Sequence, residues 1–452
     1  MKSIVAESVR RPPTFTPLRG AAALAALSAS LAPAPAANTN FAFKAEASVQ
    51  ETYDSNVYLQ DVTPHFNPAL VHPGAVLAQP LYGSFVNTAT PRLAFDYQPD
   101  DAFHAAVSYA PEVVIFDRAS SEDHVTHRGV VNLGGQTGAL TWEQADNFTW
   151  IDGNDYGLDF GGPGMAPAIG GIPTRDRRSA FIYRGGLKLT YTLDKWFLRP
   201  VASGYIHDFF TQQIPNVATP GFAGYDPYYE NYVDRKDVNG GLDVGYQVLD
   251  KTWLVAGYRY GSQFTGNLIG ATLNGVPLHY DSLYHRLLVG VEGQPTDWAK
   301  LTTALGPELH HFTDVTAPKF NRNLVAMYID ACGAFQLTKQ DTLTLLAKRF
   351  LQPSYASASV YNDVTYNINW RRRLNDHFNC GAGFQAYEGD WAAPIIRDDW
   401  IYTANASLSY SYDKHWGGEL GYSYDFALSQ FPGFAGRGFT RHMVWLGVKY
   451  TL

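Results

Sequence analysis

Apolar and polar residues alternate along most of the chain that follows residue 40. The clearest stretch is 360–370, in which Val, Asn, Val, Tyr, Ile and Trp occupy the even positions and Tyr, Asp, Thr and Asn the odd ones. Residues 402–412 and 242–248 follow the same pattern. Because successive side chains of a strand point to opposite faces, the pattern predicts β-strands with one apolar and one polar face.

Short turns that carry Asp or Asn join pairs of these segments. The turns at 193–196, 249–253, 374–378 and 412–416 read LDKW, LDKTW, LNDHF and YDKHW, and an aromatic residue usually brackets them. Asp and Asn favour such turns because their side chains bond the backbone just ahead. Longer segments rich in Gly, Pro and Asn separate the hairpins, at 61–84, 152–178, 211–233, 265–279 and 389–397. Short turns alternating with long loops are typical of a transmembrane antiparallel up-and-down β-barrel, with the short turns in the periplasm.

We expect about eighteen strands, an even number as in bacterial single-chain barrels, with sixteen as the alternative. Residues 141–151 alternate poorly and make the weakest strand. The expected strands are 41–58, 85–97, 102–116, 125–139, 141–151, 179–193, 197–210, 236–249, 253–265, 281–293, 299–313, 323–337, 341–351, 357–371, 376–388, 399–412, 416–428 and 439–452.

A soluble β-propeller or β-sandwich also alternates and turns often, but its apolar face points inward. In this chain the polar face carries Gly, Ser, Asn, Asp and Arg, and the turn spacing keeps no fixed repeat. In a membrane barrel, aromatic residues near the turns would face the headgroup layer, whereas in a soluble sheet they would be ordinary cross-strand pairs. The expected girdle comprises Trp196, Trp253, Trp298, Phe378, Tyr410, Tyr412, Trp416 and Tyr450.

Composition and the first residues narrow the location. The net charge of −8 argues against a nucleic-acid partner, because phosphate contacts need a basic face. No run of about 18 apolar residues follows the N-terminal region, so a helical membrane bundle is not expected. Residues 1–37 combine early basic residues, a short apolar core at 20–32 and an Ala-Pro-Ala sequence at 34–36. They are expected to form an export signal, with the barrel spanning 38–452, although a disordered Ala/Pro tail would look similar.

The polar faces of the expected strands carry charges of both signs that would face an aqueous lumen. Their balance predicts neither anion nor cation preference, and they could be no more than solvated wall residues. Aromatic residues on the lumen wall (Tyr183, Tyr205, Trp253 and Tyr361) would be a stacking track for a glycan, and Asp152 to Pro173 is a candidate loop inside the bore. The luminal candidates are Lys44, Glu46, Arg92, Asp96, Glu112, Arg184, Lys188, Arg199, Asp243, Arg259, Arg286, Glu292, Glu308, Asp330, Asp363, Glu419, Asp425 and Lys449.

No enzyme motif is apparent. The sequence lacks a Gly-x-Ser-x-Gly elbow and a His-Glu-x-x-His pair, so we expect no catalytic residue, no cofactor and no metal. His310 and His311 are adjacent in a strand and would point to opposite faces. His124 and His127 beside two acidic residues fit a solvated loop better than a metal site.

The charged clusters and the cysteines suggest only structural roles. The basic runs at 371–373 and 175–178 are expected to be charged rims of the barrel, with contact to anionic headgroups or glycans as the alternative. Cys332 is expected to face the lumen and Cys380 the lipid, about three strands apart, which excludes a disulfide.

Two segments resemble a known group of proteins. The last ten residues, MVWLGVKYTL, place Val444, Leu446, Val448, Tyr450 and Leu452 on one face after the pattern of the terminal recognition strand of outer-membrane barrels. ASVQETYDSNVYLQD at 47–61 contains YDSNV, which is similar to a first-strand motif of a porin group sometimes associated with exopolysaccharide loci. The whole mature chain resembles the outer-membrane β-barrel porin families of Gram-negative bacteria.

The resemblance implies an outer-membrane location, contact with lipid and lipopolysaccharide, and assembly through the C-terminal strand by the barrel-assembly machinery. The function it favours is a channel for passive passage of small hydrophilic solutes. A barrel for exopolysaccharide export or binding, and a structural or surface barrel with an occluded lumen, are the alternatives. Whether the chain forms a homo-oligomer is left open.

Overall fold

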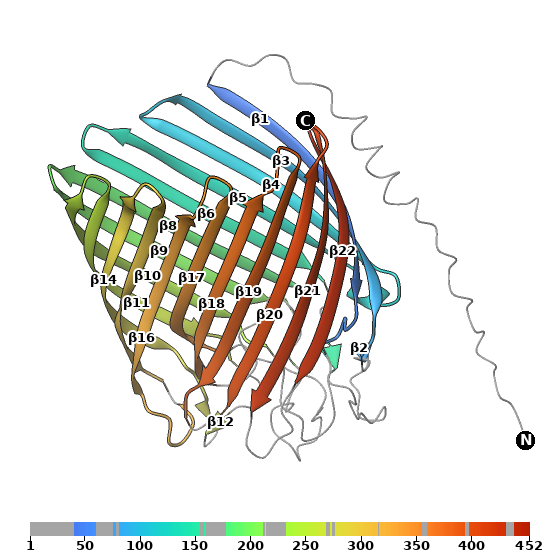
Figure 1. Ribbon diagram of the computed structural model, residues 1–452. Coiled ribbons are helices and arrows are strands. Elements are labelled where there is room, and N and C mark those ends of the chain that lie inside the picture. The colour runs from blue at the N-terminus through green and yellow to red at the C-terminus, as the bar shows by residue number, and fades with distance from the viewer. Residues whose placement is uncertain are drawn as a thin grey trace, which may run out of the picture.

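The computed structural model describes residues 40–59, 76–77, 81–153, 158–159, 178–210, 213, 232–267, 272–273, 276–314, 316–354, 359–393, 397–430 and 438–452. Eighteen long strands form one antiparallel sheet that closes on itself (Figure 1). They are β1 (Phe41–Asp54), β3 (Ser84–Asp100), β4 (Phe103–Phe116), β5 (His124–Thr137), β6 (Leu140–Asp152), β8 (Ala180–Leu193), β9 (Trp196–Phe209), β10 (Arg235–Leu249), β11 (Thr252–Thr265), β14 (Ser282–Thr296), β15 (Ala299–Phe312), β16 (Asn323–Gln336), β17 (Asp341–Pro353), β18 (Val360–Arg373), β19 (Phe378–Trp391), β20 (Asp398–Ser411), β21 (Trp416–Gln430) and β22 (Phe439–Thr451).

The last strand closes the barrel against the first. β22 pairs with β1 from Glu46 opposite Thr451 to Asp54 opposite Met443, and the two strands lie side by side in Figure 1. The short turns gather at the upper end of that view and the long connections at the lower end. The prediction of an eighteen-stranded barrel is confirmed, and the alternative of sixteen strands is wrong. The weakest predicted strand, 141–151, is present as β6.

Four two-residue strands and one short helix complete the described structure. β2 (Val76–Leu77) pairs with β7 (Leu158–Asp159), and β12 (Thr272–Leu273) pairs with β13 (Val276–Pro277). The single helical turn is η2, a 3-10 turn over Ser120–Glu122. Among the described residues no helix is long and apolar enough to cross a bilayer.

The predicted Asp and Asn turns form by the expected side-chain contacts. The Oδ1 atom of Asp413 accepts hydrogen bonds from the backbone N–H groups of His415 (2.8 Å) and Trp416 (2.7 Å). The Oδ1 atom of Asn375 accepts from the next-but-one and third residues in the same way, at 2.9 and 2.8 Å. These contacts satisfy turn N–H groups locally and make each hairpin reverse within a few residues.

The two faces of the wall have the predicted chemistry. Along β14, Leu287 and Val289 face outward and are 53% and 59% exposed. Arg286 and Leu288, which alternate with them, face inward and are each 9% exposed. The same alternation places large apolar side chains on the outer face of every neighbouring strand, because strand side chains have a period of two. The apolar face therefore points away from the barrel axis.

One part of the wall departs from a regular cylinder. β16 and β17 pair from Gln336 opposite Thr342 up to Ile329 opposite Arg349, and then the ladder stops. β17 nevertheless continues to Pro353, still paired with β18. The long-loop ends of β17 and β18, residues 351–353 and 360–363, lean into the bore, where residues 351–353 contact β10 and β11. We call these residues the inner tip.

Candidate functional site

The inner tip contacts β11 and β10, which lie four and five strands away from β17 along the wall. The Nη1 atom of Arg235, on β10, donates to Gln352 Oε1 (3.0 Å) and to the carbonyl oxygen of Pro353 (2.9 Å). On β11 the Nε2 atom of Gln263 donates to the carbonyl oxygen of Leu351 at 3.1 Å. β17 lies four strands further round the sheet than β11. These bonds therefore cross the bore and narrow it at the long-loop end.

A network of ion pairs lies on the inner wall, nearer to the short-turn end than the inner tip is. The guanidinium of Arg199 forms a bidentate pair with Glu292 (2.8 Å for both bonds) and also bonds Asp243 Oδ2 (3.0 Å). Arg259 donates to the other oxygen of the same aspartate at 2.6 Å. Bidentate charged hydrogen bonds fix both position and orientation. The network is a rigid patch in which each charge has an opposite partner.

A second cluster is fully buried against β14 and β15. Glu308 is 0% exposed and accepts from Arg286 Nε at 2.5 Å, while the Nε2 atom of His310 lies 2.5 Å from its other oxygen. The Nδ1 atom of His310 lies 3.1 Å from the Ser282 hydroxyl, and the Arg286 guanidinium stacks 3.7 Å from the centre of the Tyr328 ring. A buried carboxylate is tolerated only with such partners. His310 and His311 face opposite sides, as predicted, and His310 is a member of this buried cluster.

Ion pairs also line the wall on the far side of the sheet. Arg441 bonds Asp54 with an Nε–Oδ1 distance of 2.9 Å across the β22–β1 closure. Arg128 pairs with Glu112 at 3.1 Å, between β5 and β4. Charges of both signs therefore alternate around the described inner wall, and no large sector carries a single sign.

The structure places the luminal candidates on the inner face of their strands. Arg259 and Arg286 stand directly opposite each other on β11 and β14, and Lys188 stands opposite Glu143 on the β8–β6 ladder. The loop candidate, Asp152 to Pro173, lies largely outside the described residues. Sequence reasoning missed Arg235 and Gln352, because nothing local shows that two residues 117 positions apart meet across the bore.

The aromatic residues near the short turns lie mostly on the outer face. Trp416 packs on Tyr450 with ring centres 4.9 Å apart, and Phe378 packs on Tyr410 at 4.7 Å. Trp253 differs from the expectation, since it stands opposite the inward-facing Glu292. Of the expected girdle, the outer-face residues in strands or turns are Trp196, Trp298, Phe378, Tyr410, Tyr412, Trp416 and Tyr450.

Trp253 faces inward, and not outward as predicted, because of the length of its turn. Trp196 and Trp253 both follow an Asp-Lys turn, but the second turn contains the additional residue Thr252. The ladder between β10 and β11 shifts register at that point. One extra residue moves a strand side chain to the opposite face.

The expected stacking track does not form. Tyr183 faces outward, where its hydroxyl donates to Asp146 at 2.7 Å and its ring packs on Phe148. Tyr361 faces inward but is 0% exposed within the inner tip. Tyr205 and Trp253 face inward, so the expected set is split between two faces of the wall.

The two cysteines are not bonded to each other, and His124 and His127 lie on different faces of the wall. Neither Cys332 nor Cys380 is disulfide bonded, as predicted. His127 lies on the outer face, where its Nδ1 atom is 2.7 Å from the Tyr109 hydroxyl. His124 lies on the inner face and its Nδ1 atom contacts the carbonyl oxygen of Glu122. The two histidines therefore do not share a site.

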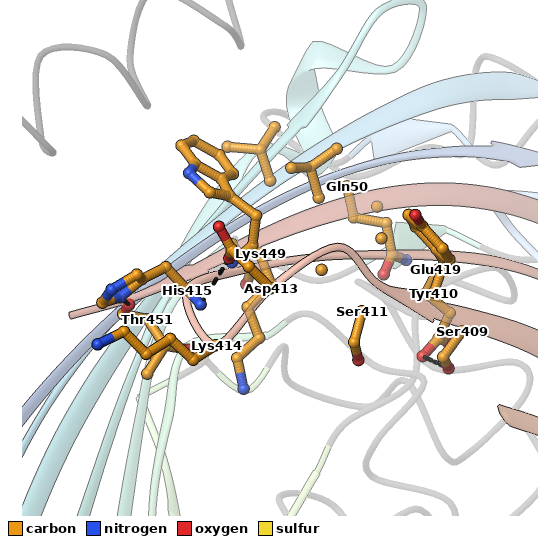
Figure 2. Close-up of a pocket in the computed structure, with 17 residues that line it drawn as sticks. Gln50, Ser409, Tyr410, Ser411, Asp413, Lys414, His415, Glu419, Lys449 and Thr451 are labelled. Carbon is orange, nitrogen blue, oxygen red and sulfur yellow. Dashed lines mark hydrogen bonds between the residues drawn. The ribbon is translucent and has the colours of Figure 1, made fainter. Parts of the chain in front are cut away.

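A hollow of about 450 Å³ opens at the short-turn end beside the closure of the barrel. Figure 2 shows its polar lining, which includes Gln50 of β1, Ser409 of β20, Glu419 of β21 and Lys449 of β22. Ser409 donates to Glu419 at 3.3 Å, and Lys449 lies 3.4 Å from Glu46. These polar side chains lie in the hollow beside apolar ones such as Val49 and Trp416.

No family model matches the chain, and no curated protein matches it. Among solved structures it is similar to OccAB4 of Acinetobacter baumannii (11% identity, 92% of this chain and 99% of that chain, TM-score 0.41) and to the outer membrane protein opdK of Pseudomonas aeruginosa (10%, 91% and 99%, 0.41). It is also similar to a mutant of the ferric enterobactin receptor PfeA of Pseudomonas aeruginosa (9%, 91% and 80%, 0.43).

The location follows from the geometry. A sheet can lie in hydrocarbon only when it closes, because its edge groups otherwise lack hydrogen-bond partners. This barrel is closed, its outer face is apolar, and aromatic side chains flank its short turns. Antiparallel barrels of this construction belong to bacterial outer membranes, and the chain is accordingly an outer-membrane β-barrel protein.

Proposed function

We propose that the protein is an outer-membrane channel for passive passage of small hydrophilic solutes. The observation that carries the proposal is the contrast between the two faces of one wall. Apolar side chains cover the outside, and ion pairs such as Arg199 with Glu292 cover the inside. A polar, charged inner wall stabilises water and dissolved solutes in a barrel of this size.

The inner tip supplies the constriction. Hydrogen bonds from Arg235 and Gln263 hold the tip across the bore, so the narrowest part lies near the long-loop end. The luminal charges are paired with opposite partners, which predicts weak ion selectivity. Solutes would be sorted mainly by size and polarity.

Planar-bilayer recording of the purified full chain tests the proposal. We expect ohmic channels in potassium chloride with a reversal potential near zero in a salt gradient. Arg259→Ala leaves Asp243 with one cationic partner fewer and should shift the reversal potential toward cation preference. Glu292→Gln should shift it toward anion preference. Absence of conductance in wild type and in a variant whose tip is released would refute the channel.

The glycan alternative gains no support from the wall, because the expected aromatic track is divided between the two faces. An occluded structural barrel would give no current in wild type, and a current that appears only after release of the inner tip would show a closed channel. Export through residues 1–37, assembly through the C-terminal strand, binding of lipopolysaccharide and the absence of enzymatic activity stay predictions.

A further inference from the structure

The wall is split between β16 and β17 at the long-loop end. Continuing their register beyond Ile329 and Arg349 would pair residues 328, 327, 326 and 325 with residues 350, 351, 352 and 353. These pairs are absent, although both segments are described as strand. On its other side, β16 stays paired with β15 up to Asn323. The part of β16 nearer the long loops is thus a strand edge within the barrel wall; we call this break the seam.

Such an edge is costly at membrane depth. Backbone N–H and C=O groups that face lipid without a partner cost several kcal/mol each, which is why membrane barrels close completely. A bilayer accommodates about 9–11 residues of a tilted strand. Counted from Gln336 at the short-turn end, this distance reaches the seam. The seam therefore opens at the level of the membrane leaflet nearer the long loops.

Apolar side chains fill the space behind the seam. Phe312, Leu351 and Val360 form a buried cluster with Tyr280 and Phe320 of the adjoining loops. Leu324 and Ala326, the inward-facing residues of the β16 edge, pack against this cluster. On the outer side of the same edge, Val325 is 73% exposed. Two other buried apolar clusters lie at the long-loop end, around Phe116 and around Ile401, but the strands that carry them stay paired there. Among the described clusters, the one around Leu351 is distinguished by the unpaired edge of β16 beside it.

We propose that the seam is a lateral portal, through which a small apolar molecule passes between the mouth at the long-loop end and the adjoining leaflet. Between β16 and β17 the apolar cluster takes the place of ladder bonds at this point, and packing can rearrange without breaking a hydrogen-bonded ladder. The portal is separate from the polar bore proposed above. The apolar cluster offers an apolar molecule a dry route, which the ion-paired bore does not.

A reversible cross-link across the seam tests the portal. In a Cys332→Ser, Cys380→Ser background, Leu324→Cys and Leu351→Cys introduce thiols into one apolar cluster, the first on the edge of β16 and the second on β17. The variant is expressed in Gram-negative cells with an intact lipopolysaccharide leaflet, and uptake of the apolar dye N-phenyl-1-naphthylamine is followed by fluorescence. We expect uptake to exceed that of cells without the protein, to fall to their level on oxidation, and to recover on reduction.

A matched pair controls for the cross-link itself. Ala331→Cys and Ala347→Cys are directly opposed on the bonded part of the same two strands, and oxidation of this pair should leave dye uptake unchanged. Ala326→Trp enlarges a side chain packed in the seam and should lower uptake without any cross-link. Dye uptake that equals that of cells without the protein, or that ignores both the oxidised seam and Ala326→Trp, would overturn the portal.

Two further measurements separate the portal from the channel. Bilayer conductance of the oxidised seam variant should match that of its reduced form, because ions use the bore; loss of conductance in both forms would count against the channel and not against the portal. Those amide hydrogens of 324–328 that point toward β17 should exchange faster than the corresponding ones of 330–336. Equal protection along β16 would show that the seam is closed by backbone bonds and would overturn the portal.

Discussion

Arg235→Ala should release the inner tip and widen the bore. The side chain donates two hydrogen bonds across the bore, to Gln352 Oε1 and to the carbonyl oxygen of Pro353. A hydrogen bond that involves a charged group contributes about 1.5–3 kcal/mol. Loss of both weakens the held position of the tip by about 3–6 kcal/mol, and a loss of only 3 kcal/mol changes the equilibrium between held and released tip by roughly 100-fold.

Single-channel recording measures this change as a larger unit conductance or a larger open fraction. Gln352→Ala removes one of these two bonds and leaves the one to the Pro353 carbonyl, and it also removes the bonds that Gln352 donates to Tyr361 and Asp363 within the tip. It should therefore also enlarge the unit conductance or the open fraction. Combining both substitutions should give less than the sum of the two single effects, because the Arg235–Gln352 bond is lost in each.

Lys236→Ala is the matched control. Lys236 is the next residue of β10, is exposed on the outer face and has a side chain of similar length. Its removal should leave unit conductance and open fraction unchanged. A conductance of Arg235→Ala equal to that of wild type and of Lys236→Ala would refute the assignment of the tip as the constriction.

Three other predictions test the wall and the turns. Arg286→Ala leaves the buried Glu308 without its arginine and should lower the unfolding free energy in lipid vesicles by about 3–5 kcal/mol, whereas joint replacement of both residues by Met and Leu should cost less; equal costs would contradict a buried pair. Leu287→Arg, on the outer face, should cost about 2–4 kcal/mol in the same assay, and Thr302→Arg, on the inner face, close to nothing; the reverse order would contradict the orientation of the wall. The pKa of Asp413 is lowered because two backbone N–H groups of its turn donate to its carboxylate, with the larger effect from Trp416 and the smaller from His415. Its carboxylate therefore stabilises the fold above the unfolded pKa of about 3.9, and that contribution is lost as pH falls through the lower folded pKa. Thermal unfolding of Asp413→Asn should thus differ from wild type at neutral pH and converge with it in strong acid, and a difference that persists there would show that the charge is irrelevant.

Strand positions and their facing were predictable because the causes are local. Alternation over a few residues sets which side chains share a face, and Asp413 and Asn375 form their turns with the adjoining backbone. The eighteen strands, the closure of the barrel and the outward apolar face follow from these local preferences together with the need to bond every strand edge in lipid. The face of Trp253 was predicted wrongly, because its turn contains one residue more, Thr252, than the similar turn before Trp196.

The charge network needed the register of several strands. Arg199 and Glu292 are 93 residues apart in sequence, and their contact depends on how far each intervening strand is staggered. Sequence placed both on the inner face but gave no reason to pair them. Register accumulates around a closed sheet, so a small change in one hairpin would alter every later neighbour.

By itself, the sequence determined a closed sheet with a wet inside and an apolar outside, because side-chain period and turn chemistry are properties of neighbouring residues. Only the tertiary structure decided that the long-loop ends of β17 and β18 lean into the bore onto Arg235 and leave β16 with an open edge. In this arrangement, the hydrogen bonds of Arg235 and the packing around Leu351 offset the ladder bonds that are missing between β16 and β17. Contacts between distant parts of the chain set this balance, and no local pattern encodes it.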